Sequence, residues 1–391
     1  MRSAMLPLVS ALVPLALAAD IFVSPTGTGT GSITAPFGSI QSAVNAAKAG
    51  DVINLRAGTY KPTKNIQITK SGTSSAPITL RSYGTEKVII DGESLTGTPA
   101  ALDAALANAD RGILHIEKAN YWKFYNLELI NGPYGVYARD ANNNYYERLS
   151  THDNYESGFQ LQGASSYNTV IYLDSYRNRD PRKNGESADG FACKEGKGEG
   201  NSIRNSRLYE NVDDGLDLWM FESAVTIEEV YAWGNGVNRW GFSNFQGDGN
   251  GFKLGGASSN PPAAPHVVRN SIAFENLKKG FIDNGNPGAI LAERNTAYKN
   301  GDTGFVFRSS NGNVRNNIAV GNTGSPQATT VSTVKASGNS WQSGSWSDSS
   351  FTSTSSTSIK AVRLSNGRVQ GSNFLLPTSG AAIGATTQAD V

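Results

Sequence analysis

Leu208-Tyr-Glu-Asn-Val-Asp-Asp-Gly-Leu-Asp-Leu218 contains the pattern that decides the fold: an aromatic residue, one variable residue, Asn, three variable residues, then Gly and an alternating apolar segment. The pattern recurs between about residues 125 and 325. Its Asn and Gly pairs are Asn131/Gly135, Asn154/Gly158, Asn211/Gly215, Asn276/Gly280 and Asn300/Gly304. Uninterrupted copies are ~22–25 residues long, the length of one solenoid coil with short strands. The sequence therefore predicts a solenoid.

The repeated Asn would lie at the same corner of every coil, where it can bond to the Asn of the coils above and below. Such a ladder would satisfy buried backbone groups of the turns. The residue two positions before each corner Asn is usually aromatic, and we expect these side chains to stack inside the coil. They are Leu129, His152, Tyr176, Tyr209, Trp233, Phe274 and Tyr298. His152 is therefore expected to be a core residue and not a catalyst.

These features predict an all-β chain folded as a right-handed parallel β-helix. A leucine-rich repeat fits less well, because its leucine spacing is absent and helices are hard to find. Gln41 to Ala47 shows the one convincing amphipathic helical pattern, which we expect to cap the first coil. Strand-like runs follow at Val52–Leu55, Ile66–Ile68, Ile78–Leu80 and Val88–Ile90.

The two ends of the chain differ in composition from the repeat region. Residues 1–19 have the features of a signal peptide: Arg2, an apolar run from Met5 to Leu17, and small residues before Asp20. The run is too short to span a membrane, so we expect a secreted protein. Residues 20–391 are expected to form one domain. Beyond about residue 325 Ser, Thr and Gly dominate, and the short apolar runs Ala361–Leu364 and Phe374–Leu376 suggest that residues 325–391 pack back as a cover.

Charge and cysteine content exclude several classes of function. Charged residues make up 17% of the chain and the formal net charge is +1, so the concentrated basic field of a nucleic-acid or membrane-surface binder is missing. A polyanion would have to be bound at a local site. The one cysteine, Cys193, falls on an inward position, which argues against a catalytic thiol. No signal for an oligomer is present, and we expect a monomer.

Two corners depart from the regular spacing. Asn178 precedes Gly190 by twelve residues and Asn235 precedes Gly251 by sixteen, where other coils have four. Both insertions fall at the same corner, on the coils either side of the one that starts at Asn211. Loops on a rigid scaffold commonly carry function. We expect these two to wall a cleft whose floor is the strand of the middle coil.

The register of the repeat predicts what that floor displays. The second residue after each Gly should point outward, because its neighbours are the apolar inward residues. On successive coils this column is Gln160, Ala192, Asp217, Lys253, Ile282 and Val306. Asp217 and Lys253 are therefore expected on adjacent rungs, about 4.8 Å apart. The residue before each Gly forms a second column, which is Ser157, Asp189, Asp214, Asn250 and Lys279.

Four carboxylates, those of Asp189, Asp213, Asp214 and Asp217, thus converge within two rungs. Unpaired, they would repel one another and their pKa values would rise. A divalent cation with oxygen ligands would relieve the repulsion, and Ca²⁺ suits such a flexible site. The alternative is a hydrated acidic face with Lys253 as its salt-bridge partner. The spacing alone leaves both interpretations open.

Three sequence blocks carry a resemblance to a known family. They are Ser187-Ala-Asp-Gly-Phe-Ala-Cys-Lys, Asn211-Val-Asp-Asp-Gly-Leu-Asp-Leu-Trp and Gly247-Asp-Gly-Asn-Gly-Phe-Lys-Leu-Gly-Gly. In this order and spacing they resemble polysaccharide lyase family 9, the pectate lyases. The similarity extends over most of the mature chain. The first hundred residues, in contrast, resemble many secreted β-helix proteins.

The resemblance implies a calcium-dependent lyase that cleaves α-1,4-polygalacturonate by β-elimination. Asp189, Asp213, Asp214 and Asp217 match the family's calcium-binding aspartates, and Lys253 matches its catalytic base. A lysine base must be unprotonated, so an alkaline optimum is expected. Substrate carboxylates would need further cations along the cleft. Candidates are Lys194 and Arg308, each four residues past a repeat Gly, and Arg239 in the longer loop.

Three other functions remain open from the sequence. A hydrolase of the polygalacturonase type would use a pair such as Asp213 and Asp214, but inversion needs carboxylates ~6.5–9.5 Å apart. The Gly-His-Gly of β-helix hydrolases is also absent, since none of the three histidines lies between glycines. A non-catalytic carbohydrate-binding β-helix would not require Lys253. A lyase acting on another uronate, such as alginate, would share the elimination chemistry.

Overall fold

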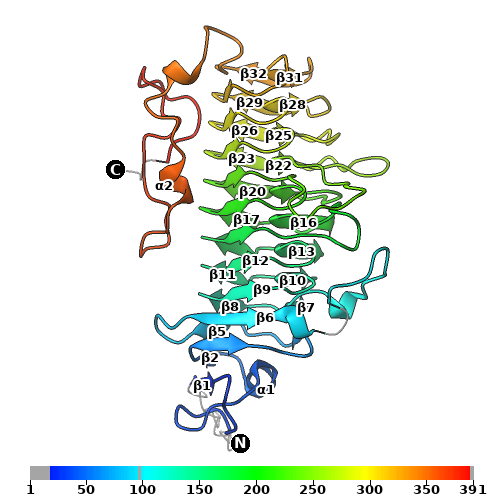
Figure 1. Ribbon diagram of the computed structural model, residues 1–391, viewed down its shortest axis with the longest axis vertical. Coiled ribbons are helices and arrows are strands. Elements are labelled where there is room, and N and C mark those ends of the chain that lie inside the picture. The colour runs from blue at the N-terminus through cyan, green and yellow to red at the C-terminus, as the bar shows by residue number, and fades with distance from the viewer. Residues whose placement is uncertain (1–17, 96–97, 388–391) are drawn as a thin grey trace, which may run out of the picture.

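A computed structural model describes residues 18–95 and 98–387. The chain coils through three parallel sheets of twelve, ten and ten strands, stacked along one long axis (Figure 1). Within each sheet, strands of successive coils pair in parallel register. The expected parallel β-helix is confirmed. The signal peptide predicted at residues 1–19 lies, apart from its last two residues, outside the described residues.

The three sheets are numbered 1 to 3 here. Sheet 1 consists of β1 (Asp20–Val23), β2 (Val52–Leu55), β5 (Ile78–Ser82), β8 (Trp122–Tyr125), β11 (Tyr145–Glu147), β14 (Thr169–Ile171), β17 (Asn201–Arg204), β20 (Val225–Glu228), β23 (Val267–Arg269), β26 (Leu291–Glu293), β29 (Asn313–Arg315) and β32 (Lys335–Ser337). Sheet 2 consists of β4 (Ile66–Ile68), β7 (Leu114–Glu117), β10 (Val136–Arg139), β13 (Phe159–Gly163), β16 (Phe191–Gly196), β19 (Leu216–Asp217), β22 (Phe252–Lys253), β25 (Phe281–Ile282), β28 (Phe305–Phe307) and β31 (Ala328–Thr330). Sheet 3 consists of β3 (Gly58–Tyr60), β6 (Val88–Asp91), β9 (Glu128–Ile130), β12 (Ser150–His152), β15 (Asp174–Tyr176), β18 (Arg207–Tyr209), β21 (Tyr231–Trp233), β24 (Ile272–Phe274), β27 (Thr296–Tyr298) and β30 (Ile318–Val320). The helical elements are α1 (Ile40–Ala46), α2 (Thr357–Lys360), η1 (Gly92–Ser94), η2 (Asn108–Asp110) and η3 (Asp348–Ser350).

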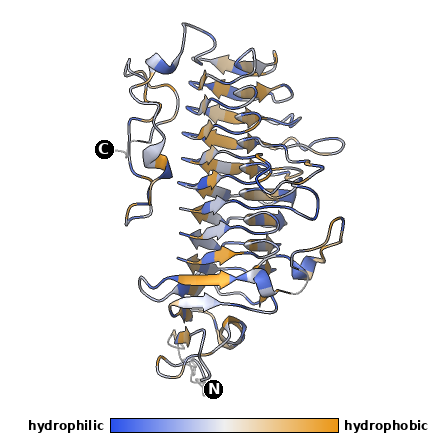
Figure 2. Cartoon of the chain, in the orientation of Figure 1, coloured by the Kyte–Doolittle hydropathy of each residue, from blue (hydrophilic) through white to orange (hydrophobic). Residues whose placement is uncertain are grey.

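One apolar core fills the inside of the coil along its length. Figure 2 shows apolar residues concentrated in the stacked strands, with polar residues in the loops around them. In sheet 2, Phe252, Phe281 and Phe305 stack on successive rungs with ring centroids 4.6 and 4.8 Å apart. Cys193 is fully buried on this inner face, and burial raises the pKa of its thiol. Its predicted inward position is confirmed.

The first coil is capped by α1, as the amphipathic pattern predicted. The helix begins one residue earlier than expected, because the Ser39 hydroxyl accepts a hydrogen bond from the Ser42 amide and so provides the N-cap. Ile40, Ala43 and Val44 form its buried face. The helix lies at the N-terminal end of the solenoid (Figure 1), where it covers core residues that no further coil would cover.

The asparagine ladder is confirmed over most of its length. The amide of Asn211 donates to the side-chain oxygen of Asn235 at 3.0 Å, and Asn235 donates to Asn276 at 2.8 Å. The ladder starts at Asn154 and ends beyond Asn300 on Asn322 and Gln327. Each rung also donates to a backbone carbonyl of the previous coil, such as Ala232 O for Asn276. The ladder therefore satisfies buried backbone groups that the turns leave unpaired.

The corner of the first predicted coil lies at residue 132, one residue later than the predicted Asn131. Asn131 lies outside the ladder, with a backbone φ of 56°, and bonds to Asp91. Gly132 takes the corner position, where its amide donates to the Asn154 side chain. A Cβ at residue 132 would lie 2.3 Å from Ile113 Cγ1. The corner here has no room for an asparagine side chain, which explains the shift.

The aromatic residues before the ladder stack outside the coil, which corrects the prediction that they stack inside. Along β12, β15, β18 and β21 the ring centroids of His152, Tyr176, Tyr209 and Trp233 are 4.4, 4.6 and 4.2 Å apart. The middle residue of each of these strands points inward instead, such as Leu208 in the core. Side chains alternate along a strand, so the aromatic neighbours must face outward. His152 is accordingly a partly exposed residue of the outer face, bonded to Glu128 and Asp153.

The C-terminal segment, residues 338–387 after β32, runs alongside the stacked coils (Figure 1). It packs against sheet 3, where it covers part of this aromatic stack. Phe374 contacts Phe274 edge-on, with ring centroids 5.3 Å apart, and Phe374 and Leu375 are buried. The run Ala361–Leu364 differs from its expected apolar role, because Val362 is 90% exposed. Its charged member Arg363 makes the contact, through a 2.7 Å ion pair with Asp174 of β15.

No helix among residues 18–95 and 98–387 is both long enough and apolar enough to cross a membrane.

Candidate active site

Two columns of side chains on sheet 2 build the site. The structure pairs Ala192 with Asp217, Asp217 with Lys253 and Lys253 with Ile282 on successive rungs. The predicted outward column is confirmed. In the column before each Gly, Asp189 accepts a hydrogen bond from the Asp214 amide at 3.3 Å, and the Asn250 amide group donates to Asp214 at 2.9 Å. The regular stacking of coils therefore sets which acidic and basic residues become neighbours.

Two inserted loops, residues 179–189 and 236–250, rise beside these columns and touch each other. The Gln246 backbone amide donates to Asn184 O at 3.0 Å. A third segment, residues 98–107 before η2, joins them, since the Asp103 backbone amide donates to Arg182 O at 2.9 Å. The repeat spacing did not predict this contact. A cavity of about 510 Å³ lies between the three segments. Its lining includes no residue of β19, so it differs from the expected cleft, whose floor was to be that strand. Asp217 is only 1% exposed, where an open outward position was expected, and Lys194 and Lys253 lie against its carboxylate.

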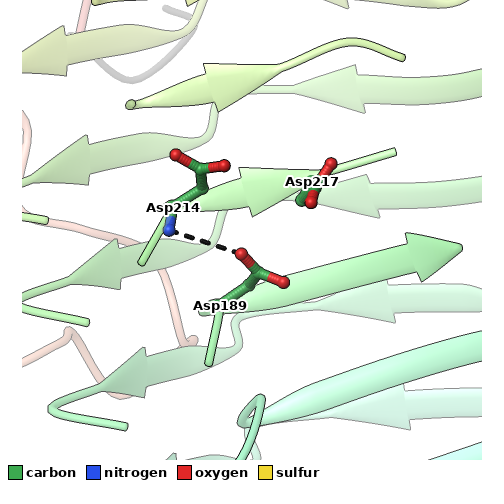
Figure 3. Close-up of side chains that lie close together, drawn as sticks. All are labelled: Asp189, Asp214 and Asp217. Atoms are coloured by element: carbon green, nitrogen blue, oxygen red, sulfur yellow. Dashed lines mark hydrogen bonds between the residues drawn. The ribbon is translucent and has the colours of Figure 1, made fainter. Parts of the chain in front are cut away.

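Three aspartates form a compact cluster at the base of the loops. One carboxylate oxygen from each of Asp189, Asp214 and Asp217 lies within 4.8 Å of the others (Figure 3). Asp213 belongs to a second, adjoining group with Asp214 and Asp248. Asp248 was not identified from the sequence, because it lies in a loop where the repeat register does not apply. The Asp248 amide donates to the Asp213 carboxylate at 2.6 Å, which ties the longer loop to the cluster.

Two lysines offset part of the negative charge of the cluster. Lys253 Nζ lies 3.3 Å from Asp214 Oδ2, 3.5 Å from Asp217 Oδ2 and 2.9 Å from Asp248 Oδ2. Its side chain is 13% exposed, so it is less open to solvent than the outward register implied. Lys194 Nζ lies 2.7 Å from both Asp189 Oδ2 and Asp217 Oδ2. Lys194, which the sequence predicts to bind substrate, therefore contacts the acidic cluster directly.

Burial dominates the protonation of the carboxylates. It raises the pKa of Asp189 to about 8, although Lys194 opposes the shift. It raises the pKa of Asp214 to about 6, and that of Asp213 well above its ordinary value with further help from Asp214. Asp217 differs, because the two neighbouring ammonium groups outweigh burial and lower its pKa. The cluster therefore holds more negative charge than its surroundings favour.

The lysines respond in the opposite direction. Burial by itself would lower the pKa of Lys253, but the carboxylates of Asp217 and Asp214 hold that pKa well above its ordinary value. The same balance, with Asp189 as the leading carboxylate, raises the pKa of Lys194. Both side chains are therefore ammonium ions in the metal-free protein.

The cluster has the donor set that a hard divalent cation requires. All its candidate ligands are carboxylate oxygens, and calcium binds oxygen ligands in flexible geometry. Asp214 Oδ2 is buried and has no hydrogen-bond partner, in spite of the ammonium of Lys253 at 3.3 Å. A buried acceptor without a donor is costly. These residues therefore fit a calcium ion.

The other two predicted substrate contacts lie away from the cluster. Arg239 is bonded to Gly234 O at 3.0 Å and faces Glu210 at 4.0 Å, both on the sheet 3 side of the corner. Arg308 is exposed and follows β28, two rungs beyond the rung of Lys253. That separation is about 10 Å along the axis. The structure thus brings together Lys194, Lys253 and the aspartates, and leaves the two arginines outside.

Comparison with known proteins agrees with this geometry. The model of a family described as Pel9A-like, right handed beta helix region, matches residues 21–322. Pectate lyase PEL9 of Emericella nidulans is 57% identical, covering 97% of each chain. Pectate lyase L of Dickeya chrysanthemi is 35% identical over 83% of this chain and 75% of its own. The crystal structure of pectate lyase Pel9A has a TM-score of 0.78 at 32% identity, covering 94% of this chain and 90% of that one.

Fold and site together define a right-handed parallel β-helix protein with a buried centre of aspartates and lysines. The chain belongs to the Pel9A-like family, the pectate lyases of polysaccharide lyase family 9. The resemblance carried by the three sequence blocks is confirmed, and with it the handedness of the coil. A solved rhamnogalacturonan lyase, at 24% identity and a TM-score of 0.75, shares the fold.

Proposed function

We propose that this chain is a secreted, monomeric pectate lyase that cleaves α-1,4-polygalacturonate by calcium-assisted β-elimination. Lys253 is the catalytic base in this proposal, and Asp189, Asp213, Asp214 and Asp217 hold the calcium ion. The observation that supports it most directly is the position of Lys253 Nζ, 3.3 Å from Asp214 and 3.5 Å from Asp217. A base and a cation site within a few ångströms of each other are what elimination next to a carboxylate requires.

The proposed reaction begins with Lys253 in its neutral form. Its Nζ takes the proton from C5 of a galacturonate unit, and the electron pair of the C5–H bond becomes the C4=C5 double bond. The C4–O4 bond breaks, and the departing oxygen takes a proton from solvent. The products are a fragment with a new reducing end and a fragment whose non-reducing end is an unsaturated uronide, and Lys253 then returns its proton to solvent. When bound, calcium would screen both the substrate carboxylate and the aspartates, which stabilises the enolate-like charge and favours neutral Lys253.

The loop-lined corner gives the base a suitable setting. The four aspartates of the proposed calcium site are at most 1% exposed, so their charges interact in a medium that contains little water. Electrostatic interactions are stronger in such a medium than in bulk water. Asp248 bonds to Lys253 at 2.9 Å and holds the ammonium at the open edge of the cluster.

One assay tests the proposal. The purified chain is incubated with polygalacturonate, either with calcium or with a chelator, and the ultraviolet absorbance of an unsaturated uronide is followed. We expect absorbance with calcium and almost none with chelator. Reducing ends without absorbance would point to a hydrolase instead. Absorbance only with alginate or another uronate would mean the same elimination chemistry on a different substrate. No product at all would indicate a non-catalytic carbohydrate-binding protein.

A further inference from the structure

Lys194 occupies a place inside the acidic cluster that the proposed reaction does not explain. It extends from β16, one rung before Asp217, and its Nζ bridges Asp189 Oδ2 and Asp217 Oδ2 at 2.7 Å each. The two carboxylates are 0% and 1% exposed, and the lysine side chain is 14% exposed. A surface lysine reaching for substrate would extend into solvent. This one is folded back onto the oxygens that are candidates for calcium.

The charge balance explains why the lysine is folded back. Asp189 makes its ion pair with Lys194, whereas Asp214 pairs with Lys253. Without Lys194, the Asp189 carboxylate would be buried with hydrogen bonds from the Ser157 hydroxyl and the Asp214 amide but no cation. A buried charge without a partner is strongly destabilising. In the metal-free protein Lys194 therefore acts as the counter-ion of Asp189, a fully buried carboxylate.

We propose that Lys194 is a built-in substitute for the metal: it neutralises the cluster when the site is empty and leaves when a divalent cation binds. The inference rests on the proposed calcium site. An ammonium and a divalent ion that share the same two buried oxygens would repel each other at close range, where the low dielectric screens little. Binding of the cation must therefore include release of the lysine, and the affinity for calcium is weakened by the contacts that are given up.

Calcium affinity tests the competition directly. The full chain is stripped with chelator and titrated with calcium chloride by isothermal titration calorimetry, as wild type, Lys194→Met and Lys197→Met. Lys197 is an exposed lysine just past the end of β16 and controls for loss of a charge on the same coil. We expect Lys194→Met to bind calcium about tenfold more tightly than wild type, a typical coupling between competing sites, and Lys197→Met to bind within about twofold of wild type.

A second measurement needs no variant, so it stands if Lys194→Met fails to fold. Wild-type protein is reductively methylated with and without saturating calcium, and the modified lysines are quantified by peptide mass spectrometry. Methylation of Lys194 should rise severalfold with calcium, because the released ammonium becomes accessible. Methylation of Lys197 should stay constant.

The outcomes separate this inference from the proposed function. If wild type binds no calcium, both are overturned. If wild type binds calcium but Lys194→Met binds it equally or more weakly, or Lys194 is methylated no faster with calcium, then Lys194 is a fixed part of the site. In that case the substitution of metal by lysine is overturned, and the calcium site stands.

Discussion

At the scale of single residues, the repeat register decides the chemistry. Asp217 and Lys253 hold the same position on neighbouring rungs, and the parallel pairing of β19 with β22 makes them neighbours. If both strands were shifted by one residue, the side chains of Asp217 and Lys253 would point into the apolar core, where an ionised side chain has no partner. The site therefore depends on the ladder that keeps every coil in step.

Replacing Lys253 by methionine should abolish most turnover. Methionine keeps a similar length without a base, so we expect kcat to fall by roughly 10²- to 10⁴-fold. The stripped variant should also unfold at a lower temperature, because Asp214 and Asp248 lose their ammonium partner and Asp217 keeps only Lys194, and calcium should restore much of the loss. Initial rates of uronide absorbance and thermal unfolding by circular dichroism measure the two effects.

The control for this substitution is Lys299→Met, which removes an ion pair with Asp348 in the C-terminal segment. That variant should keep wild-type turnover. If the Lys253→Met protein kept more than a tenth of wild-type activity, Lys253 would be ruled out as the base.

Activity should rise with pH above neutrality. The base form of Lys253 is the reactive one, and the neighbouring carboxylates of the metal-free protein hold its pKa well above the ordinary value. Raising the pH increases the fraction of neutral lysine, so the rate at saturating calcium should increase into the alkaline range. A profile of initial rate against pH that peaked clearly below about 6 would be incompatible with a lysine base.

The residues that the sequence predicted are those that the register controls. Asp189, Asp214, Asp217 and Lys253 follow from counting positions relative to the repeat Gly. The inward fold of Lys194 could not be predicted, because a long flexible side chain four residues past the Gly can reach either solvent or the cluster. Asp248 could not be predicted either, since its loop has no partner coil to fix its position.

At the scale of elements, the asparagine ladder joins one coil to the next. Asn276 accepts from both the backbone amide and the side chain of Asn235, and donates to Ala232 O and Asn300 Oδ1. Each contact runs between coils, so a ladder residue supports three rungs at once. Alternation along sheet 3 also explains why the aromatic residues were predicted on the wrong face. The sequence shows that they lie two positions before the ladder Asn, but at that spacing both the Asn and a core aromatic are plausible inward residues.

Replacing Asn276 by alanine should destabilise the solenoid without a direct effect on the chemistry. The substitution leaves buried donors and acceptors of two neighbouring coils unpaired, and we expect a loss of about 3 kcal/mol. The control is Asn244→Ala, an exposed residue of the longer loop, for which a change within about 0.5 kcal/mol is expected. Urea unfolding followed by fluorescence measures both. Equal stability of the two variants would show that the ladder is dispensable.

At the scale of the whole molecule, an ionic contact fastens the C-terminal segment to the solenoid. Asp174 of β15 accepts hydrogen bonds from Arg207 of β18 and from Arg363, a residue almost two hundred positions later. Arg207 also donates to the carbonyls of Ile359 and Ala361 at 3.0 and 2.6 Å. The segment that covers the outer aromatics is therefore held at a partly buried cluster of one carboxylate and two guanidinium groups.

The pH dependence of stability should report this contact. Burial alone would raise the pKa of Asp174, but Arg363 and Arg207 outweigh it and lower that pKa. A carboxylate whose pKa is lower in the folded than in the unfolded chain stabilises fully above the unfolded value of about 3.9, and the contribution is lost as pH falls through the folded pKa. Asp174→Asn should therefore cost about 3 kcal/mol near neutral pH, and its deficit relative to wild type should shrink below pH of about 4.

Urea unfolding at pH 7, 5 and 3 would measure the deficit, with Asp348→Asn as the control. Asp348 belongs to the same segment but pairs with Lys299 in an exposed ion pair, and exposed pairs contribute at most about 1 kcal/mol. Limited proteolysis adds a local readout, because a loosened segment should be cleaved after Arg363 or Arg368 sooner in Asp174→Asn than in the control. A deficit of equal size at pH 3 and pH 7 would mean that the amide disturbs packing and that the charge of Asp174 does not hold the segment.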